Sequence, residues 1–252
     1  MYNEQPAVVV PIHGVRGLGY DEGTGALYVS SYHDHCIHKI DSTGYITVQS
    51  GLCTQNNNQS GSFSNTRYRY PGDIEMDPLN PGNFFVIDQT DQGISSLKYV
   101  NTYSGTGSSR NILGIPVPGN SIGNITLSTS PNYATAIAVN ASQVCIANGN
   151  GNFYATSSVI CYSRSGSGSL SLYVGNRNNP TLGTTAFRGR AQKYIEDEGV
   201  GMRYFVDGDN IDPINIPVQL ADPQGLAFDD EGNLFITETR GHTIRMVKRW
   251  YP

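Results

Sequence analysis

The densest group of side chains able to do chemistry lies between His33 and His38, where histidine, aspartate and cysteine occur together. Imidazoles, carboxylates and thiolates are the ligands that zinc prefers, so this group has the composition of a metal site. If this segment is a strand, however, His35 and His38 point to opposite faces of a sheet, because side chains alternate along a strand. We therefore assign no metal ligands to this group.

A second candidate is the acidic run Asp207, Asp209 and Asp212, whose carboxylate spacing loosely matches a calcium-binding loop. The run lacks the rest of an EF-hand pattern, so we interpret it as a structural turn, with bound calcium as the alternative. The sequence contains neither a Gly-x-Ser-x-Gly elbow nor a phosphate-binding glycine loop. We accordingly assign no catalytic residues.

Composition indicates short strands rather than helices. Only 15% of the 252 residues are charged, whereas Gly (29), Pro (13) and Tyr (16) are abundant. The net charge of -5 argues against a nucleic-acid partner, because phosphate binding needs concentrated Lys and Arg. No segment is apolar enough to span a membrane, and the first residues do not resemble a signal peptide. We expect a native signal or a parent domain to lie outside this sequence.

Three short segments of alternating apolar residues recur along the chain, separated by turns rich in Asp and Gly, as is typical of β-strands. The clearest copy reads DPQGLAFD at 222–229, GNLFITET at 232–239 and GHTIRMV at 241–247. The other copies occupy 16–21, 26–31 and 35–41; 71–77, 82–88 and 93–97; and 136–140, 143–147 and 158–162. Fourth strands are predicted at 45–50, 111–117 and 170–174.

These segments resemble the NHL repeat, which runs Pro-x-Gly-Ile-Ala-Val-Asp, then Gly-Asn-Ile-Tyr-Val-Ala-Asp, then Asn-His-Arg-Ile. The resemblance is strongest at 222–247 and weakest at 136–162. It implies an all-β propeller of four-stranded antiparallel blades at roughly 15–50, 71–117, 134–175 and 223–250. Six blades would require two more without a recognisable motif. The repeat also aligns His35 with His242 and His38 with Arg245, which gives both histidines a structural explanation.

The last repeat lacks an outer strand, because few residues follow Val247. Propellers of this family commonly close by strand exchange, which removes an exposed sheet edge. We therefore predict that the segment 7–11 is the missing strand, and that 1–252 is a single closed propeller domain.

The four cysteines fall into two pairs on neighbouring predicted strands: Cys36 with Cys53, and Cys145 with Cys161. Both pairs can meet the Cα separation that a disulfide needs. We expect two disulfides, with free buried thiols as the alternative, and hence an oxidising compartment.

Insertions gather on one face of the predicted propeller. The loops from one blade to the next (51–70, 118–133 and 176–222) share this face with the loop 148–157 inside the third blade. Long loops on a rigid scaffold commonly carry function, so we predict a recognition surface on this face. Its candidate ligand-binding residues are Tyr68, Tyr70, Tyr154, Arg177, Arg188, Arg190, Tyr194 and Tyr204.

We therefore expect a non-enzymatic extracellular or cell-surface module, such as the head of an adhesin or fibre, that binds a glycan or a protein. Amides and aromatic rings suit sugars, and the same mixture suits adaptable protein binding. The resemblance also leaves open a metal-dependent lyase or hydrolase with a metal in the central channel. The innermost strands, however, offer Tyr20, Glu75 and Phe228 rather than convergent ligands. A third hypothesis is a structural domain that positions its neighbours.

Overall fold

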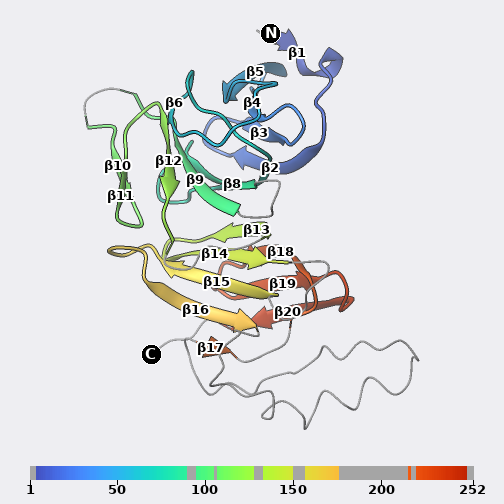
Figure 1. The fold of residues 1–252 in the computed structure, drawn as a ribbon, viewed down its shortest axis with the longest axis vertical. Coiled ribbons are helices and arrows are strands. Elements are labelled where there is room, and N and C mark those ends of the chain that lie inside the picture. The colour runs from blue at the N-terminus through green and yellow to red at the C-terminus, as the bar shows by residue number, and fades with distance from the viewer. Residues whose placement is uncertain are drawn as a thin grey trace.

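The structure is a computed structural model that describes residues 4–89, 95–104, 107–127, 133–149, 157–175, 215–216 and 220–248. Within these ranges the chain is almost entirely β-structure, and its one helix is the 3-10 turn η1 (Ala7–Val9). Four antiparallel sheets, or blades, follow one another in a propeller arrangement, as predicted (Figure 1). No helix in the described ranges is long and apolar enough to cross a membrane.

From its innermost strand outwards, the first blade contains β2 (Val15–Asp21), β3 (Ala26–Ser31), β4 (Cys36–Ile40), β5 (Tyr45–Ser50) and β1 (Gln5–Pro6). In the same order, the second contains β7 (Pro71–Met76), β8 (Phe84–Gln89), β9 (Ser95–Asn101), β12 (Ser121–Ile125) and β6 (Gly61–Ser62). The third contains β13 (Ala134–Val139), β14 (Gln143–Asn148), β15 (Ser158–Ser163), β16 (Leu170–Gly175) and the parallel strand β17 (Asn215–Ile216). The fourth contains β18 (Pro223–Phe228), β19 (Leu234–Glu238) and β20 (Thr243–Val247).

An Asp or Asn side chain closes the turn after the innermost strand of every blade. In each turn this side chain accepts a hydrogen bond from a backbone amide two or four residues further along the chain. The pairs are Asp21 with Gly23, Asp77 with Leu79, Asn140 with Ser142, and Asp229 with Asn233. Asp and Asn favour such turns because their short side chains reach backbone amides just ahead of them. This explains why the repeats carry Asp or Asn at this position.

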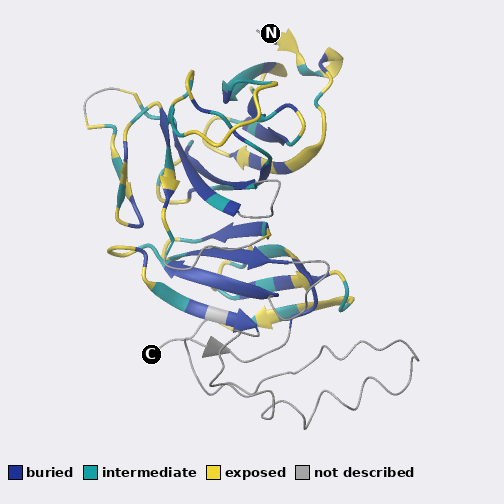
Figure 2. Ribbon diagram, in the orientation of Figure 1, coloured by how far each residue is buried: buried dark blue, intermediate teal, exposed yellow. Residues whose placement is uncertain are grey.

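Apolar side chains fill the space between neighbouring blades (Figure 2). Between the first two blades, the rings of Tyr28 and Phe84 lie 4.7 Å apart. Between the second and third blades, Phe85 and Ile137 belong to one buried cluster. A further cluster joins the third blade to the fourth and includes Leu234. This burial of apolar surface is the main force that holds the blades together.

The prediction that 7–11 is the outer strand of the last blade is wrong. Ala7–Val9 form η1, and the preceding Gln5–Pro6 pair with Ile46 and Tyr45 of β5. Gln5–Pro6 therefore protect the outer edge of the first blade, which follows them in sequence, and not that of the fourth. Among the described residues, β20 is the outermost strand of the fourth blade.

The predicted fourth strand at 111–117 is also wrong, whereas those at 45–50 and 170–174 are confirmed as β5 and β16. Arg110–Ile112 (β10) and Ile115–Val117 (β11) instead form a hairpin of their own. Leu113 and Gly114 both have positive φ (50° and 84°), as a tight two-residue hairpin turn requires. The fourth strand of the second blade is β12, further along the chain.

Candidate functional site

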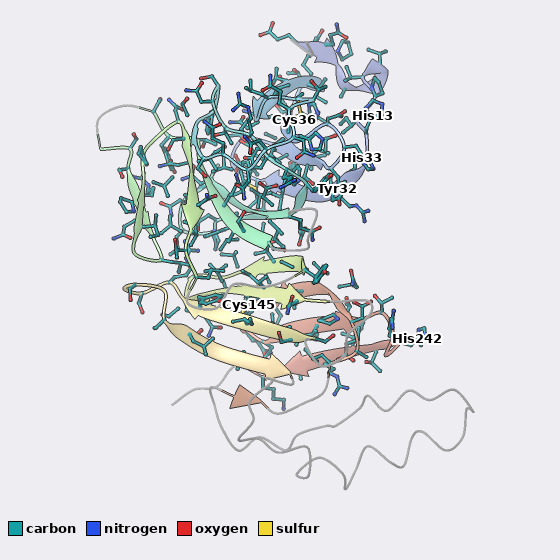
Figure 3. The ribbon with its side chains drawn as sticks, viewed as in Figure 1. His13, Tyr32, His33, Cys36, Cys145 and His242 are labelled. Atoms are coloured by element: carbon teal, nitrogen blue, oxygen red, sulfur yellow. A yellow bond between two sulfur atoms is a disulfide. The ribbon has the colours of Figure 1, made fainter. Side chains whose placement is uncertain are left out.

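Aromatic and basic side chains gather where the first two blades meet, on the face that carries the blade-to-blade loops. The rings of Tyr32 and Tyr70 stack, with centroids 4.7 Å apart and an interplanar angle of 21°. His33 meets the Tyr32 ring edge-on at 5.1 Å, and His35 lies 5.5 Å from the Tyr70 ring. The guanidinium of Arg16 lies 5.1 Å from the Tyr32 centroid. We call these five residues the Tyr32–Tyr70 cluster; Figure 3 labels Tyr32 and His33.

The Tyr32–Tyr70 cluster is open to solvent. Arg16 and His33 are exposed, and the other three members are half-buried. Asn56, from the loop 51–70, donates a hydrogen bond from Nδ2 to the Tyr70 hydroxyl at 3.4 Å. The cluster therefore combines ring surface, two imidazoles, a cation and an amide, which can stack on a ligand and hydrogen-bond to it.

A buried ion pair fixes the Tyr70 side of the cluster. Asp88 Oδ1 accepts hydrogen bonds from the backbone amides of Arg69 (2.8 Å) and Tyr70 (2.9 Å). Its Oδ2 lies 3.3 Å from Lys98 Nζ, and both charged side chains are fully buried. Lys98 also donates to the backbone carbonyls of Gln59 (3.4 Å) and Arg67 (3.2 Å). One buried pair thus holds the loop 51–70 at four residues.

A second carboxylate fixes the Tyr32 side. Asp34 accepts hydrogen bonds from Ser31 Oγ (2.6 Å) and from the His13 amide (3.1 Å), and lies 2.9 Å from His13 Nδ1. Burial alone would raise the pKa of Asp34, but the hydrogen bonds from Ser31 and His13 outweigh it and lower that pKa. Gly14 lies under the loop at φ +70°, where an added Cβ would stand 2.5 Å from the His33 ring. The chain therefore needs glycine there.

The histidines of the segment His33–His38 do not converge. His35 donates from Nδ1 to the carbonyl of Arg69, whereas the buried His38 places Nε2 3.5 Å from Cys36 Sγ and 4.0 Å from Asp34 Oδ2. His35 and His242 share a positive φ (62° and 50°), a conformation that histidine tolerates, in agreement with their alignment in the repeat.

Ligand atoms of Cys36, His38 and Cys53 lie within 4.8 Å of one another. The two sulfurs are bonded to each other, so neither is a thiolate that could bind a metal in this state.

Both predicted disulfides are confirmed. Cys36–Cys53 has a Cα separation of 5.1 Å and ties β4 to the start of the loop 51–70. Cys145–Cys161 has a Cα separation of 4.0 Å and links directly paired positions on β14 and β15.

The structure brings Tyr70 into the cluster but places Tyr68 elsewhere. Tyr68 is fully buried, its hydroxyl lies 3.0 Å from Ser50 Oγ, and Lys98 Nζ lies 5.1 Å from its ring. Its prediction as a ligand-binding residue is therefore wrong. The other predicted residues lie outside the described ranges: Tyr154, Arg177, Arg188, Arg190, Tyr194 and Tyr204, and the calcium candidates Asp207, Asp209 and Asp212. Sequence reasoning missed Tyr32, although its loop inside the first blade belongs to the predicted recognition face.

The innermost strand of the second blade carries two carboxyl groups that face the third blade. Asp73 Oδ2 accepts a hydrogen bond from the Ile137 amide at 2.9 Å. Burial and the charge of Asp73 raise the pKa of Glu75 to about 7, and burial also raises the pKa of Asp73. Of the other inner-strand candidates, Tyr20 is 58% exposed and Phe228 packs against the third blade.

Glu75 should make stability depend on pH. Its pKa is about 7 in the folded state and about 4.5 when unfolded, so the folded state binds its proton more tightly. The free energy of unfolding should therefore fall as pH rises from about 4.5 to 7. Glu75→Gln should flatten this decline, leaving a remainder from Asp73. Urea unfolding at several pH values measures the free energy of unfolding and so checks this prediction. The exposed Glu22→Gln is the control, and an unchanged pH dependence in Glu75→Gln would contradict the assignment.

No protein-family model and no curated protein matches the sequence. Among solved structures, a streptogramin B lyase is similar at 11% identity and a TM-score of 0.52, over 97% of this chain and 55% of that one. A virginiamycin B lyase from Staphylococcus aureus with quinupristin is similar at 12% identity and a TM-score of 0.48, over 96% of this chain and 59% of that one. A gluconolactonase from Xanthomonas campestris is similar at 9% identity and a TM-score of 0.42, over 94% of this chain and 73% of that one. The chain spans about half the length of the streptogramin B lyase, and that likeness shows a β-propeller fold.

Proposed function

We propose that this chain is a non-enzymatic recognition module that binds its ligand at the Tyr32–Tyr70 cluster. The observation that carries the proposal is the stacked, solvent-accessible pair of tyrosine rings, with Arg16 and His33 beside it. Two buried carboxylates, Asp34 and Asp88, hold the two sides of the cluster in place. A preorganised site of this kind loses little conformational entropy when a ligand binds.

A glycan is the ligand class that this chemistry favours over a protein. Tyrosine rings present flat apolar surface next to a polar hydroxyl, which suits the C–H faces and the hydroxyl groups of a sugar. Around Tyr70 the loop 51–70 adds amide side chains: Asn56 contacts the Tyr70 hydroxyl, and Gln55 accepts a hydrogen bond from Arg67 at 2.9 Å. Amides offer both a donor and an acceptor, as sugar hydroxyls require.

The two disulfides support an extracellular or cell-surface setting, because disulfides persist in oxidising compartments. In such a setting the module could serve as the head of an adhesin or fibre. A glycan array, together with a pull-down from cell-surface extract, tests the proposal. Binding to a defined glycan supports it, binding to a protein alone changes the ligand class, and two blank results overturn it.

The competing hypothesis is a metal-dependent lyase or hydrolase. It would draw on the carboxyl groups of Asp73 and Glu75, which lie on the same side of an innermost strand. Elemental analysis of purified protein separates the two hypotheses. A stoichiometric transition metal that is lost in Glu75→Gln would favour the enzyme.

Tyr70→Ala should weaken binding of an array-identified glycan by about tenfold, because it removes one ring of the stacked pair. Isothermal titration calorimetry measures the change. Tyr45→Ala is the matched control: Tyr45 is an exposed tyrosine of the first blade, at the start of β5 after the turn Asp41–Gly44. Equal losses in both variants, or none in Tyr70→Ala, would contradict this site.

A further inference from the structure

The two sides of each innermost strand face different neighbours. On β2, Gly19 faces the second blade, where an added Cβ would lie 2.7 Å from Ile74 Cγ2 and 3.0 Å from the Met76 sulfur. On β13, Ala136 and Ala138 pack in the cluster shared with the fourth blade. Alternate residues of a strand point to opposite faces, so the intervening side chains face the preceding blade.

These two sides differ in size in the first, third and fourth blades, and in polarity in the second. The side toward the next blade carries small residues in the first and third blades (Gly17, Gly19, Ala136 and Ala138) and Asp73 and Glu75 in the second. The side toward the preceding blade carries large apolar residues: Ile74, Met76, Ile137, Val139, Leu226 and Phe228. Two of the three junctions between blades therefore fit a large apolar side onto a small one.

The first and the fourth blade each have one side on which no neighbouring blade packs within the described ranges. The innermost strands contact one another in chain order, β2 with β7, β7 with β13 and β13 with β18. In Figure 1 the first blade lies in the upper half, and the fourth overlaps the third in the lower half. The first blade presents its large side, where Leu18 and Tyr20 are each 58% exposed. The fourth presents its small side, with Gly225 and Ala227 on β18. Beside them on this side lie exposed apolar residues of β20, Ile244 (71%) and Met246 (47%).

We propose that the fourth blade of one copy packs on the first blade of a second copy, so that two copies close one ring. The contact would then place the large apolar side of the first blade on the small side of the fourth. The first and third junctions inside one chain combine a large side and a small side in the same way. Ala227 would meet Leu18 and Tyr20 of the second copy as Gly19 meets Ile74 and Met76.

The next strands match as well. Phe235, which pairs with Ala227, occupies the position of Tyr28, which pairs with Gly19. Leu27, which pairs with Tyr20, occupies the position of Phe84. Phe235 would therefore pack on Leu27 as Tyr28 packs on Phe84 inside the chain.

A second copy fits this arrangement because each copy supplies both ends. Twofold symmetry then produces two identical junctions and leaves neither end side exposed. The junctions would bury Leu18, Tyr20, Ile244 and Met246, which are among the most exposed large apolar side chains of the described residues. Such residues, gathered on one side of a sheet, commonly mark an interface.

Sedimentation velocity over a range of concentrations tests the association. The wild type should form a dimer, and Leu18→Asp should shift it to monomer without changing its circular dichroism spectrum. Leu79→Asp is the control, because Leu79 is 54% exposed but lies in the turn that Asp77 closes. A wild type that stays monomeric at every concentration, or larger open-ended polymers in place of a dimer, would overturn the proposal.

Cysteine cross-linking identifies the surfaces that meet. The described cysteines are all in disulfides, so an added cysteine has no native free thiol to pair with. Tyr20→Cys and Ala227→Cys, prepared separately and mixed under oxidising conditions, should give a cross-linked pair. Tyr45→Cys mixed with Ala227→Cys should not. If a chain that carries both Tyr20→Cys and Ala227→Cys cross-links only within itself, the ring closes within one copy and the proposal fails.

Discussion

Replacing Lys98 with methionine should lower the free energy of unfolding by about 3–5 kcal/mol, because it leaves the carboxylate of Asp88 buried without its cation. Burial raises the pKa of Asp88, and the charge of Lys98 and the amides of Tyr70 and Arg69 counteract part of this rise. The variant also loses the Lys98 hydrogen bonds to the carbonyls of Gln59 and Arg67. Urea unfolding monitored by tyrosine fluorescence measures the loss, which is a large share of a typical domain's stability.

The double variant Lys98→Met with Asp88→Asn separates the buried charge from the lost packing. Asp88 uses Oδ1 for the amides of Arg69 and Tyr70 and Oδ2 for Lys98. An asparagine can keep the first two bonds and carries no charge that needs a partner. The double variant should therefore recover part of the lost stability. If it is less stable than Lys98→Met alone, the buried charge is not the cause of the loss.

The blades could be predicted from sequence because the interactions that form each repeat join residues close together in the chain. Strand alternation and the Asp or Asn that closes the first turn, such as Asp229, depend on residues only a few positions apart. The disulfides followed from the same register, since Cys145 and Cys161 occupy paired positions on adjacent strands.

The errors arose where distant contacts decide the structure. The polar sequence around Tyr68 predicts an exposed side chain. Tyr68 is buried because Lys98, thirty positions further along the chain, binds the carbonyl of Arg67 and holds the loop against the second blade. The segment 7–11 reads as a strand, but Gln5–Pro6 pair with β5, which leaves Ala7–Val9 to form η1. Likewise, the stacking of Tyr32 on Tyr70 joins two loops that no sequence pattern connects.

Removing the disulfide of the third blade, with Cys145→Ala and Cys161→Ala together, should cost about 3 kcal/mol of stability. The bridge closes a loop of sequence separation 16, and its loss returns conformational freedom to the unfolded chain. The folded state should keep its structure, because the backbone ladder between β14 and β15 runs on both sides of the bridge. Guanidinium unfolding measures the cost.

The first blade offers the matched comparison, because Cys36–Cys53 has a sequence separation of 17 and should therefore contribute a similar amount to stability. Its position differs, since Cys53 begins the loop that carries Tyr70. Cys36→Ala with Cys53→Ala should therefore weaken glycan binding as well as stability, whereas the third-blade pair should affect stability alone. Loss of binding in the Cys145 and Cys161 variant, at a temperature where it is fully folded, would contradict the placement of the ligand at the Tyr32–Tyr70 cluster. Undiminished binding without Cys36–Cys53 would instead show that the Asp88–Lys98 pair holds the loop by itself.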